Sequence, residues 1–118
     1  MKAFVLGLGL SLLAGTVLAD QAKVENATAR KSGATWTFEV TISHPDTGWD
    51  HYADGWAVLA PDGTEPGYRK LHHPHENEQP FTRSLSGVSV PQNLSEVKIR
   101  AHDSVHGWSD QLYTVRLK

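Results

Sequence analysis

Polar and apolar residues alternate along several short segments of this 118-residue chain, and the clearest segment runs from Thr35 to Ser43. One set of alternate positions carries four large apolar residues: Trp36, Phe38, Val40 and Ile42. Successive side chains of a strand point to opposite faces, so this pattern predicts a strand with one buried face. The strand is expected to end at His44-Pro45, because proline lacks an N–H donor and restricts the residue before it.

Further segments also have strand character, with glycine- and proline-containing turns between them. They cover residues 21–30, 51–60, 68–71, 81–90, 96–102 and 111–118. No segment shows a sustained helical period. About seven short strands with regular turn signals predict an all-β sandwich.

The first nineteen residues have the pattern of a signal peptide. Lys2 supplies a positive charge, an apolar run follows, and Val17-Leu18-Ala19 ends in a small residue typical of a cleavage site. We expect cleavage after Ala19, a mature domain over residues 20–118 and a periplasmic or secreted location. The apolar run is too short to favour a membrane span, so no span is expected after cleavage.

The composition narrows the chemistry that this chain can perform. It contains no cysteine, which excludes disulfides, thiolate ligands and thiol nucleophiles. The formal net charge is −2, without a basic stripe, so nucleic acid is not expected as a partner. A small exported domain without disulfides depends on core packing or on a bound metal.

All seven histidines lie from residue 44 onward, and four of them cluster with aspartates in two segments. The first is SHPDTGWDHYADGW at residues 43–56, and the second is AHDSVHGW at residues 101–108. Loops of a sandwich gather at its two ends, so we expect these segments to meet. Neutral imidazole is the commonest metal-binding side chain, and with a carboxylate it suits iron, copper or zinc. The candidate ligands are His44, His51, His106, Asp103 and His102, with Asp50 as another oxygen donor.

The same residues admit an interpretation without a metal. Trp49, Tyr52 and Trp108 would then form an aromatic face for a periplasmic protein partner, and the histidines would hydrogen-bond the loops. The histidines at positions 72, 73 and 75 are open to two interpretations, as solvated residues or as replacement ligands. Three aspartates are spaced roughly like calcium ligands, but the glycine and terminal glutamate of an EF-hand loop are missing.

Around the candidate ligands the sequence resembles the desulfoferrodoxin or superoxide reductase family, whose iron domain is an immunoglobulin-like sandwich. The family has a strand ending in His-Pro and a next strand starting with His-Tyr, similar to His44-Pro45 and His51-Tyr52. Its Cys-x-x-His-Gly segment, followed by tryptophan, resembles residues 103–108 with aspartate in place of cysteine. The resemblance implies an immunoglobulin-like sandwich of about seven strands. It also implies iron bound by His44, His51 and His106, with Asp103 in the axial position.

The missing cysteine changes what the resemblance implies about activity. A carboxylate is a harder and weaker donor than the thiolate that tunes the family's iron. The family's upstream histidine is also absent here, so His102 or one of the histidines at 72–75 would have to replace it. Three functions therefore stay open: a metal-binding domain without the thiolate, a superoxide reductase-like enzyme, and a metal-free interaction module.

Overall fold

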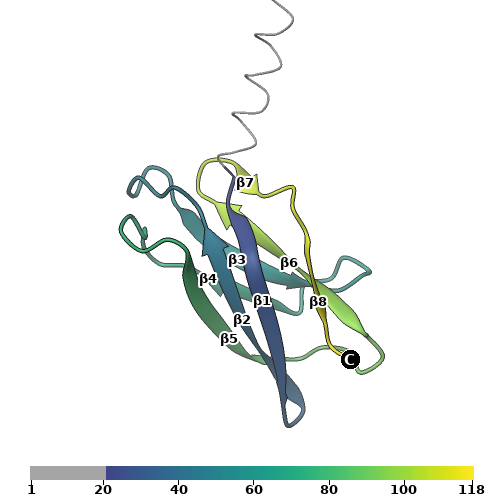
Figure 1. Cartoon of the computed structure of the whole chain (residues 1–118). Coiled ribbons are helices and arrows are strands. Elements are labelled where there is room, and N and C mark those ends of the chain that lie inside the picture. Colours follow the sequence, from purple (N-terminus) through teal and green to yellow (C-terminus); the bar gives the residue numbers. More distant parts are fainter. Residues whose placement is uncertain (1–20) are drawn as a thin grey trace, which may run out of the picture.

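The computed structural model describes residues 21–118, which form two antiparallel sheets packed face to face (Figure 1). The first sheet contains, in spatial order, β1 (Lys23–Ser32), β2 (Thr35–Ser43) and β5 (Phe81–Val88). The second contains, in spatial order, β4 (Gly67–Lys70), β3 (Ala53–Leu59), β6 (Glu96–Asp103) and β7 (Gly107–Trp108), with β8 (Tyr113–Arg116) also paired to β6. The predicted all-β sandwich is confirmed. The predicted signal peptide lies outside the described residues.

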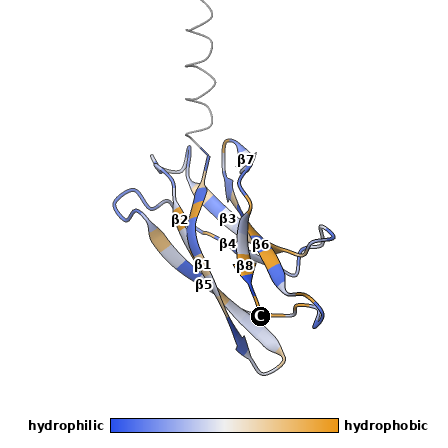
Figure 2. Ribbon diagram, turned by 45° about the vertical axis from the view of Figure 1, so that its right-hand side comes forward, coloured by the Kyte–Doolittle hydropathy of each residue, from blue (hydrophilic) through white to orange (hydrophobic). Residues whose placement is uncertain are grey.

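The core lies between the two sheets and is built by the inward positions of the alternating strands. Hydrophobic and hydrophilic colours alternate along the strands in Figure 2. The largest buried apolar side chains are Trp56, Phe38, Phe81, Ile42 and Ile99. Burying such side chains stabilises a fold by about 1.5–3 kcal/mol each. Packing of these residues therefore holds the strand ends, and the loops that leave them, in fixed positions.

The strand boundaries differ from the sequence prediction in two places that matter for the site. The strand expected from residue 51 begins at Ala53, and His51 lies in a tight turn instead, where its N–H donates to Gly48 O at 3.2 Å. The segment 103–110, expected as a loop, contains the short strand β7, which pairs with the end of β6. Gly107 enters β7 with a φ of +78°, a conformation that favours glycine.

Three loops gather at the end of the sandwich opposite the β1–β2 hairpin (Figure 1). They are the β2–β3, β4–β5 and β6–β7 loops. Two hydrogen bonds join the first to the third: Ser104 N donates to Tyr52 O at 2.9 Å, and Tyr52 N donates to Ser104 Oγ at 3.1 Å. The prediction that the segments 43–56 and 101–108 meet is confirmed. Within residues 21–118 there is no helix of the length and apolar character that a membrane crossing needs.

Candidate metal centre

His44 is the most deeply buried histidine of the site and directly follows the last residue of β2. Its imidazole is fully buried, and its Nδ1 lies 2.6 Å from Oδ1 of Asp46. An ionised carboxylate can only accept, so Nδ1 carries the hydrogen and Nε2 carries a lone pair in the neutral ring. That Nε2 atom faces His51, with a distance of 3.2 Å between the two Nε2 atoms.

His51 completes a group of three potential ligands together with His44 and Asp103. Ala53, two residues after His51, pairs with Asp103 across β3 and β6, which brings the β2–β3 loop over the end of β6. His51 Nε2 lies 3.1 Å from Asp103 Oδ1. One ligand atom from each of the three residues lies within 4.8 Å of the others, so this group could hold a metal ion.

Asp103 brings a buried negative charge to the group. Its side chain is fully buried, and Oδ1 accepts hydrogen bonds from Val105 N at 3.0 Å and His106 N at 2.7 Å. Burial raises the pKa of this carboxyl, but the two backbone donors and the charges of His106 and His44 outweigh it, so the pKa lies below its usual value. Oδ2 is buried and has no hydrogen-bond partner among residues 21–118. An ionised oxygen in that position calls for a positive partner.

The spacing of the two imidazole nitrogens fits a shared metal. Zinc binds imidazole nitrogen at about 2.0–2.1 Å, so two such ligands on a tetrahedral ion lie about 3.3 Å apart. The 3.2 Å between the Nε2 atoms of His44 and His51 is close to that span. Two imidazoles and a carboxylate are a donor set used by catalytic zinc and by non-haem iron(II), and both leave coordination positions open.

His106 lies beside the three-residue group and not within it. Its Nδ1 is 3.2 Å from Asp103 Oδ1, and its ring centroid is 5.0 Å from that of His51. Its side chain is about a quarter exposed, as is that of His51. The two rings therefore form the solvent-facing side of the site, and the buried side belongs to His44 and Asp103.

His102 is a candidate ligand that the structure does not bring to the group. It precedes Asp103 on β6, and neighbouring residues of a strand point to opposite faces of the sheet. Its Nδ1 lies 2.5 Å from Asp54 Oδ1, and its ring packs against Trp108 at 4.8 Å. His102 therefore belongs to the outer face of the second sheet, which corrects the expectation that it would join the ligands. Asp50, the alternative oxygen donor, is exposed in the β2–β3 loop.

The aromatic residues proposed as a shared binding face divide into two places. Trp49 is 67% exposed and packs edge-on against Tyr52 at 5.6 Å. Trp108 packs instead against His102 and Tyr68, on the outer face of the second sheet. Of these three aromatic residues, Trp49 and Tyr52 lie in the β2–β3 loop, which also contains His44 and His51.

His75 is the one residue of the 72–75 histidines that the structure buries. It is 6% exposed, and its ring stacks on Phe81 with centroids 3.9 Å apart. Its backbone N–H donates to Asp46 Oδ2 at 2.8 Å. His72 and His73 are exposed. The interpretation of all three as solvated residues is therefore wrong for His75.

Stability is expected to depend on pH through His75. Burial, and next the charge of Arg83, lower its pKa below the ordinary 6.5. Between the lowered pKa of the folded state and about pH 6.5 the unfolded chain binds a proton that the folded chain does not, so the free energy of unfolding falls as the pH falls through this window. His75→Gln should remove the contribution of His75 to this slope, which is at most about 1.4 kcal/mol per pH unit.

Urea unfolding of the metal-free protein between pH 7 and pH 5 measures the slope. His72→Gln, at an exposed position, is the matched control. Equal slopes in the wild type and His75→Gln would disprove the effect.

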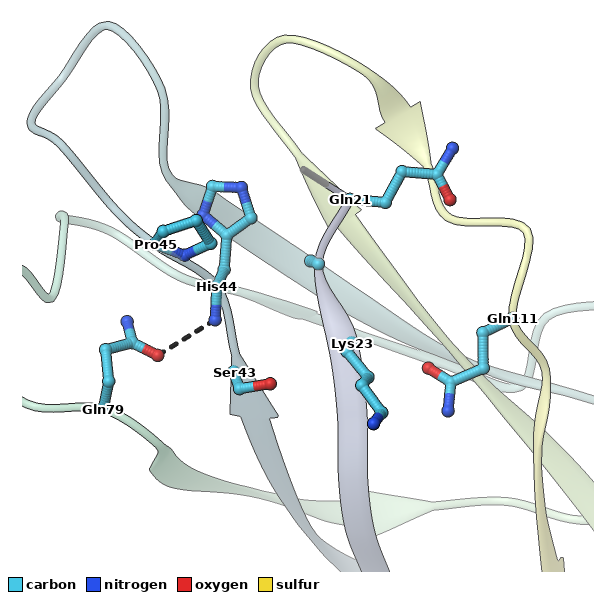
Figure 3. A pocket seen from close by; sticks show the side chains of 8 residues that line it. Gln21, Lys23, Ser43, His44, Pro45, Gln79 and Gln111 are labelled. Atoms are coloured by element: carbon cyan, nitrogen blue, oxygen red, sulfur yellow. Dashed lines mark hydrogen bonds between the residues drawn. The ribbon is translucent and has the colours of Figure 1, made fainter. Parts of the chain in front are cut away.

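An open pocket of about 600 Å³ borders His44 (Figure 3). Its glutamine side chains are already engaged with the backbone. Gln79 Oε1 accepts from His44 N at 3.0 Å, while Gln111 bonds to both N and O of Val24 at 2.8 and 3.0 Å. These amides hold the surroundings of His44 in place.

The chain is 38% identical over 96 residues to a protein of Halomicrobium mukohataei described as "Putative lipoprotein". The match covers 80% of this chain and 47% of that protein, so the chain spans about half the length of the relative. No family model matches the sequence, and no solved structure matches it.

Proposed function

We propose that this domain is an exported transition-metal-binding protein whose site is formed by His44, His51 and Asp103. The observation that carries the proposal is the convergence of two imidazole nitrogens and the buried Asp103 carboxylate. One oxygen of that carboxylate, Oδ2, lacks a partner within residues 21–118. A bound cation would satisfy all three ligands together.

A hydrogen-bond network alone explains the geometry less well. With the Nδ1 hydrogen of His44 given to Asp46, the atoms that converge are His44 Nε2, His51 Nε2 and the Asp103 carboxylate. The buried Oδ2 of Asp103 lacks a donor within residues 21–118. Leaving such an oxygen unsatisfied costs about 1–3 kcal/mol, so a divalent ion is the better partner.

Each residue has a distinct part in the proposed site. His44, buried and held by Asp46, supplies a rigid nitrogen, and Asp103 supplies the negative charge that offsets the ion. His51 supplies the second nitrogen on the partly exposed side, where an open position would face solvent. A metal in such a site serves in metal handling or, if it is iron or copper, in redox chemistry without a thiolate.

Export is part of the proposal. It is supported by the signal-peptide pattern of the first nineteen residues and by the description of the Halomicrobium mukohataei relative as a "Putative lipoprotein". A periplasmic or extracellular metal-binding domain is consistent with both.

We also propose that the domain is a divergent relative of the desulfoferrodoxin family. In support, three of the four residues matched to the family's ligands, His44, His51 and Asp103, lie together at one end of an all-β sandwich. The fourth, His106, lies beside them. Because a carboxylate replaces the thiolate, we expect superoxide reduction to be weak or absent. Reaction of the iron-loaded protein with superoxide at a rate typical of a dedicated enzyme would contradict that expectation.

A second candidate function is supported by Trp49. This side chain is 67% exposed on the loop that carries His51, which suits a contact with a periplasmic protein partner. The metal-free version of this function predicts that a chelator changes neither partner binding nor stability.

Elemental analysis of untagged protein, purified from the compartment to which it is exported, tests the metal-binding proposal. We expect about one equivalent of iron, copper or zinc per chain. Protein without metal, with unchanged stability in a chelator and no uptake of any of the three ions, would contradict the proposal.

A further inference from the structure

We propose that the β4–β5 loop, residues 71–80, is a clamp that fixes the orientation and the tautomer of His44. It acts through Gln79, through the backbone of His75 and through the carboxylate of Asp46. This set is called the His44 clamp below. The inference rests on the proposed metal-binding function and assigns a role to a loop that carries none of the three ligands.

The first contact of the clamp holds the backbone of His44. Gln79 Oε1 accepts a hydrogen bond from His44 N at 3.0 Å, drawn as the dashed line in Figure 3. The same amide donates through Nε2 to His75 O at 2.9 Å. The Gln79 side chain therefore joins the β4–β5 loop to the end of β2, at His44, which supplies one of the proposed ligand nitrogens.

The second contact holds the ring of His44. The fully buried Asp46 carboxylate accepts from His44 Nδ1 at 2.6 Å and from Ala53 N at 3.0 Å through Oδ1. Its Oδ2 accepts from His75 N at 2.8 Å. Three donors from three segments fix this carboxylate, and the carboxylate in turn fixes which nitrogen of His44 carries the hydrogen.

The β4–β5 loop also contacts β5 through His75, and these contacts fix the position of the loop. The His75 ring stacks on Phe81 with an interplanar angle of 11°. Arg83 Nη2 donates to His75 Nε2 at 2.9 Å, and the guanidinium lies 5.4 Å from the centre of the Phe81 ring. Contacts of its ring with Phe81 and Arg83, and of its backbone N–H with Asp46, therefore fix the position of His75.

This arrangement matters for metal affinity because a ligand already in the correct tautomer does not have to reorganise. Carboxylates that accept from the second nitrogen of a metal-binding histidine typically change metal affinity by about 10- to 100-fold. Asp46 and Gln79 are accordingly positioning residues, since both act through His44.

The first test needs no variant. Nitrogen-15 NMR of the histidine side chains in the metal-free wild type reports which ring nitrogen carries the hydrogen. We expect His44 in the Nδ1–H form at neutral pH. The Nε2–H form, or a mixture of both forms in rapid exchange, would overturn the clamp whether or not the protein binds metal.

The second test compares two pairs of variants by chelator competition with zinc. Asp46→Asn is matched by Asp54→Asn, since Asp54 pairs with His102 on the outer face of the sheet in the same way. Gln79→Ala is matched by Asn77→Ala, an exposed residue of the same loop. We expect zinc affinity to fall about 10- to 100-fold in Asp46→Asn, measurably less in Gln79→Ala, and not in either control.

The two proposals fail in different ways. Wild-type protein that binds no metal contradicts the proposed function, and the NMR measurement then still decides the clamp. Wild-type protein that binds zinc, with Asp46→Asn and Gln79→Ala binding it equally well, overturns the clamp alone. If Asp46→Asn does not fold, the zinc affinity of Gln79→Ala decides whether the His44 clamp exists. Gln79 is exposed, so its replacement leaves the buried Asp46 carboxylate intact.

Discussion

The His51→Ala variant is expected to fold normally and to bind metal more than about 100-fold more weakly than the wild type. The His51 side chain is 22% exposed, so its removal leaves no closed cavity in the core. It supplies one of only three proposed ligands, and its loss exceeds the 10- to 100-fold effect typical of a residue that merely supports a ligand. Metal binding to the folded state raises the free energy of unfolding by about 2.7 kcal/mol at 100 times Kd, and this gain should vanish.

The control for this prediction is His102→Ala. His102 is also partly exposed, at 27%, and is also within 3.2 Å of an aspartate, but it lies on the outer face of the second sheet. Thermal unfolding with and without added zinc should show the metal-dependent gain in His102→Ala and not in His51→Ala. The reverse result would place the metal on the wrong face of β6 for the proposed site.

The Asp103→Asn variant is expected to lose tight metal binding while retaining the β6–β7 turn. The amide keeps an oxygen for the N–H groups of Val105 and His106, which lie 3.0 and 2.7 Å from Oδ1. It removes the negative charge of the carboxylate, whose Oδ1 lies 3.1 Å from His51 Nε2, and replaces one of its two oxygens by an NH₂ group. We expect the affinity for zinc to fall more than about 100-fold, a larger effect than that of a residue that supports a ligand.

Calorimetric titration with zinc measures the loss, and Asp50→Asn is the control because Asp50 is exposed in the β2–β3 loop. Near wild-type affinity in Asp103→Asn would show that this carboxylate is not a ligand. The circular dichroism spectrum of the metal-free variant should match that of the wild type, which separates loss of a ligand from loss of the fold.

Much of the fold follows from alternation along the sequence. The strand expected from Thr35 to Ser43 has the observed bounds of β2, and Phe38 and Ile42 are buried as the pattern predicts. The two-residue strand β7 could not be predicted this way, since two residues cannot show a period. Its pairing depends on a turn at Gly107 that only the folded chain reveals.

The sequence also contained the information that separates Asp103 from His102. Val97, Ile99 and Ala101 are buried, and the same alternation continues to Asp103. A strand that buries the odd positions sends His102 to the other face. Spacing along the sequence groups His102 with Asp103, whereas the alternation of the strand places the two side chains on opposite faces.

The roles of Asp46 and Gln79 could not be predicted from the sequence for a different reason. Asp46 contacts the backbone of His75 across 29 positions, and Gln79 contacts that of His44 across 35. Such contacts depend on how the β4–β5 loop folds onto the end of the sandwich, and no local pattern encodes that placement. Only the short step from His44 to Asp46 could have been suspected from spacing.

X-ray absorption spectroscopy of the zinc-loaded, untagged protein tests the central claim most directly. The account predicts a single site with about two imidazole nitrogens at about 2.0–2.1 Å, completed by oxygen ligands, and loss of that signature in His51→Ala. A spectrum unchanged in His51→Ala but abolished by replacing the exposed His72 and His73 would place the metal on the β4–β5 loop and contradict the account.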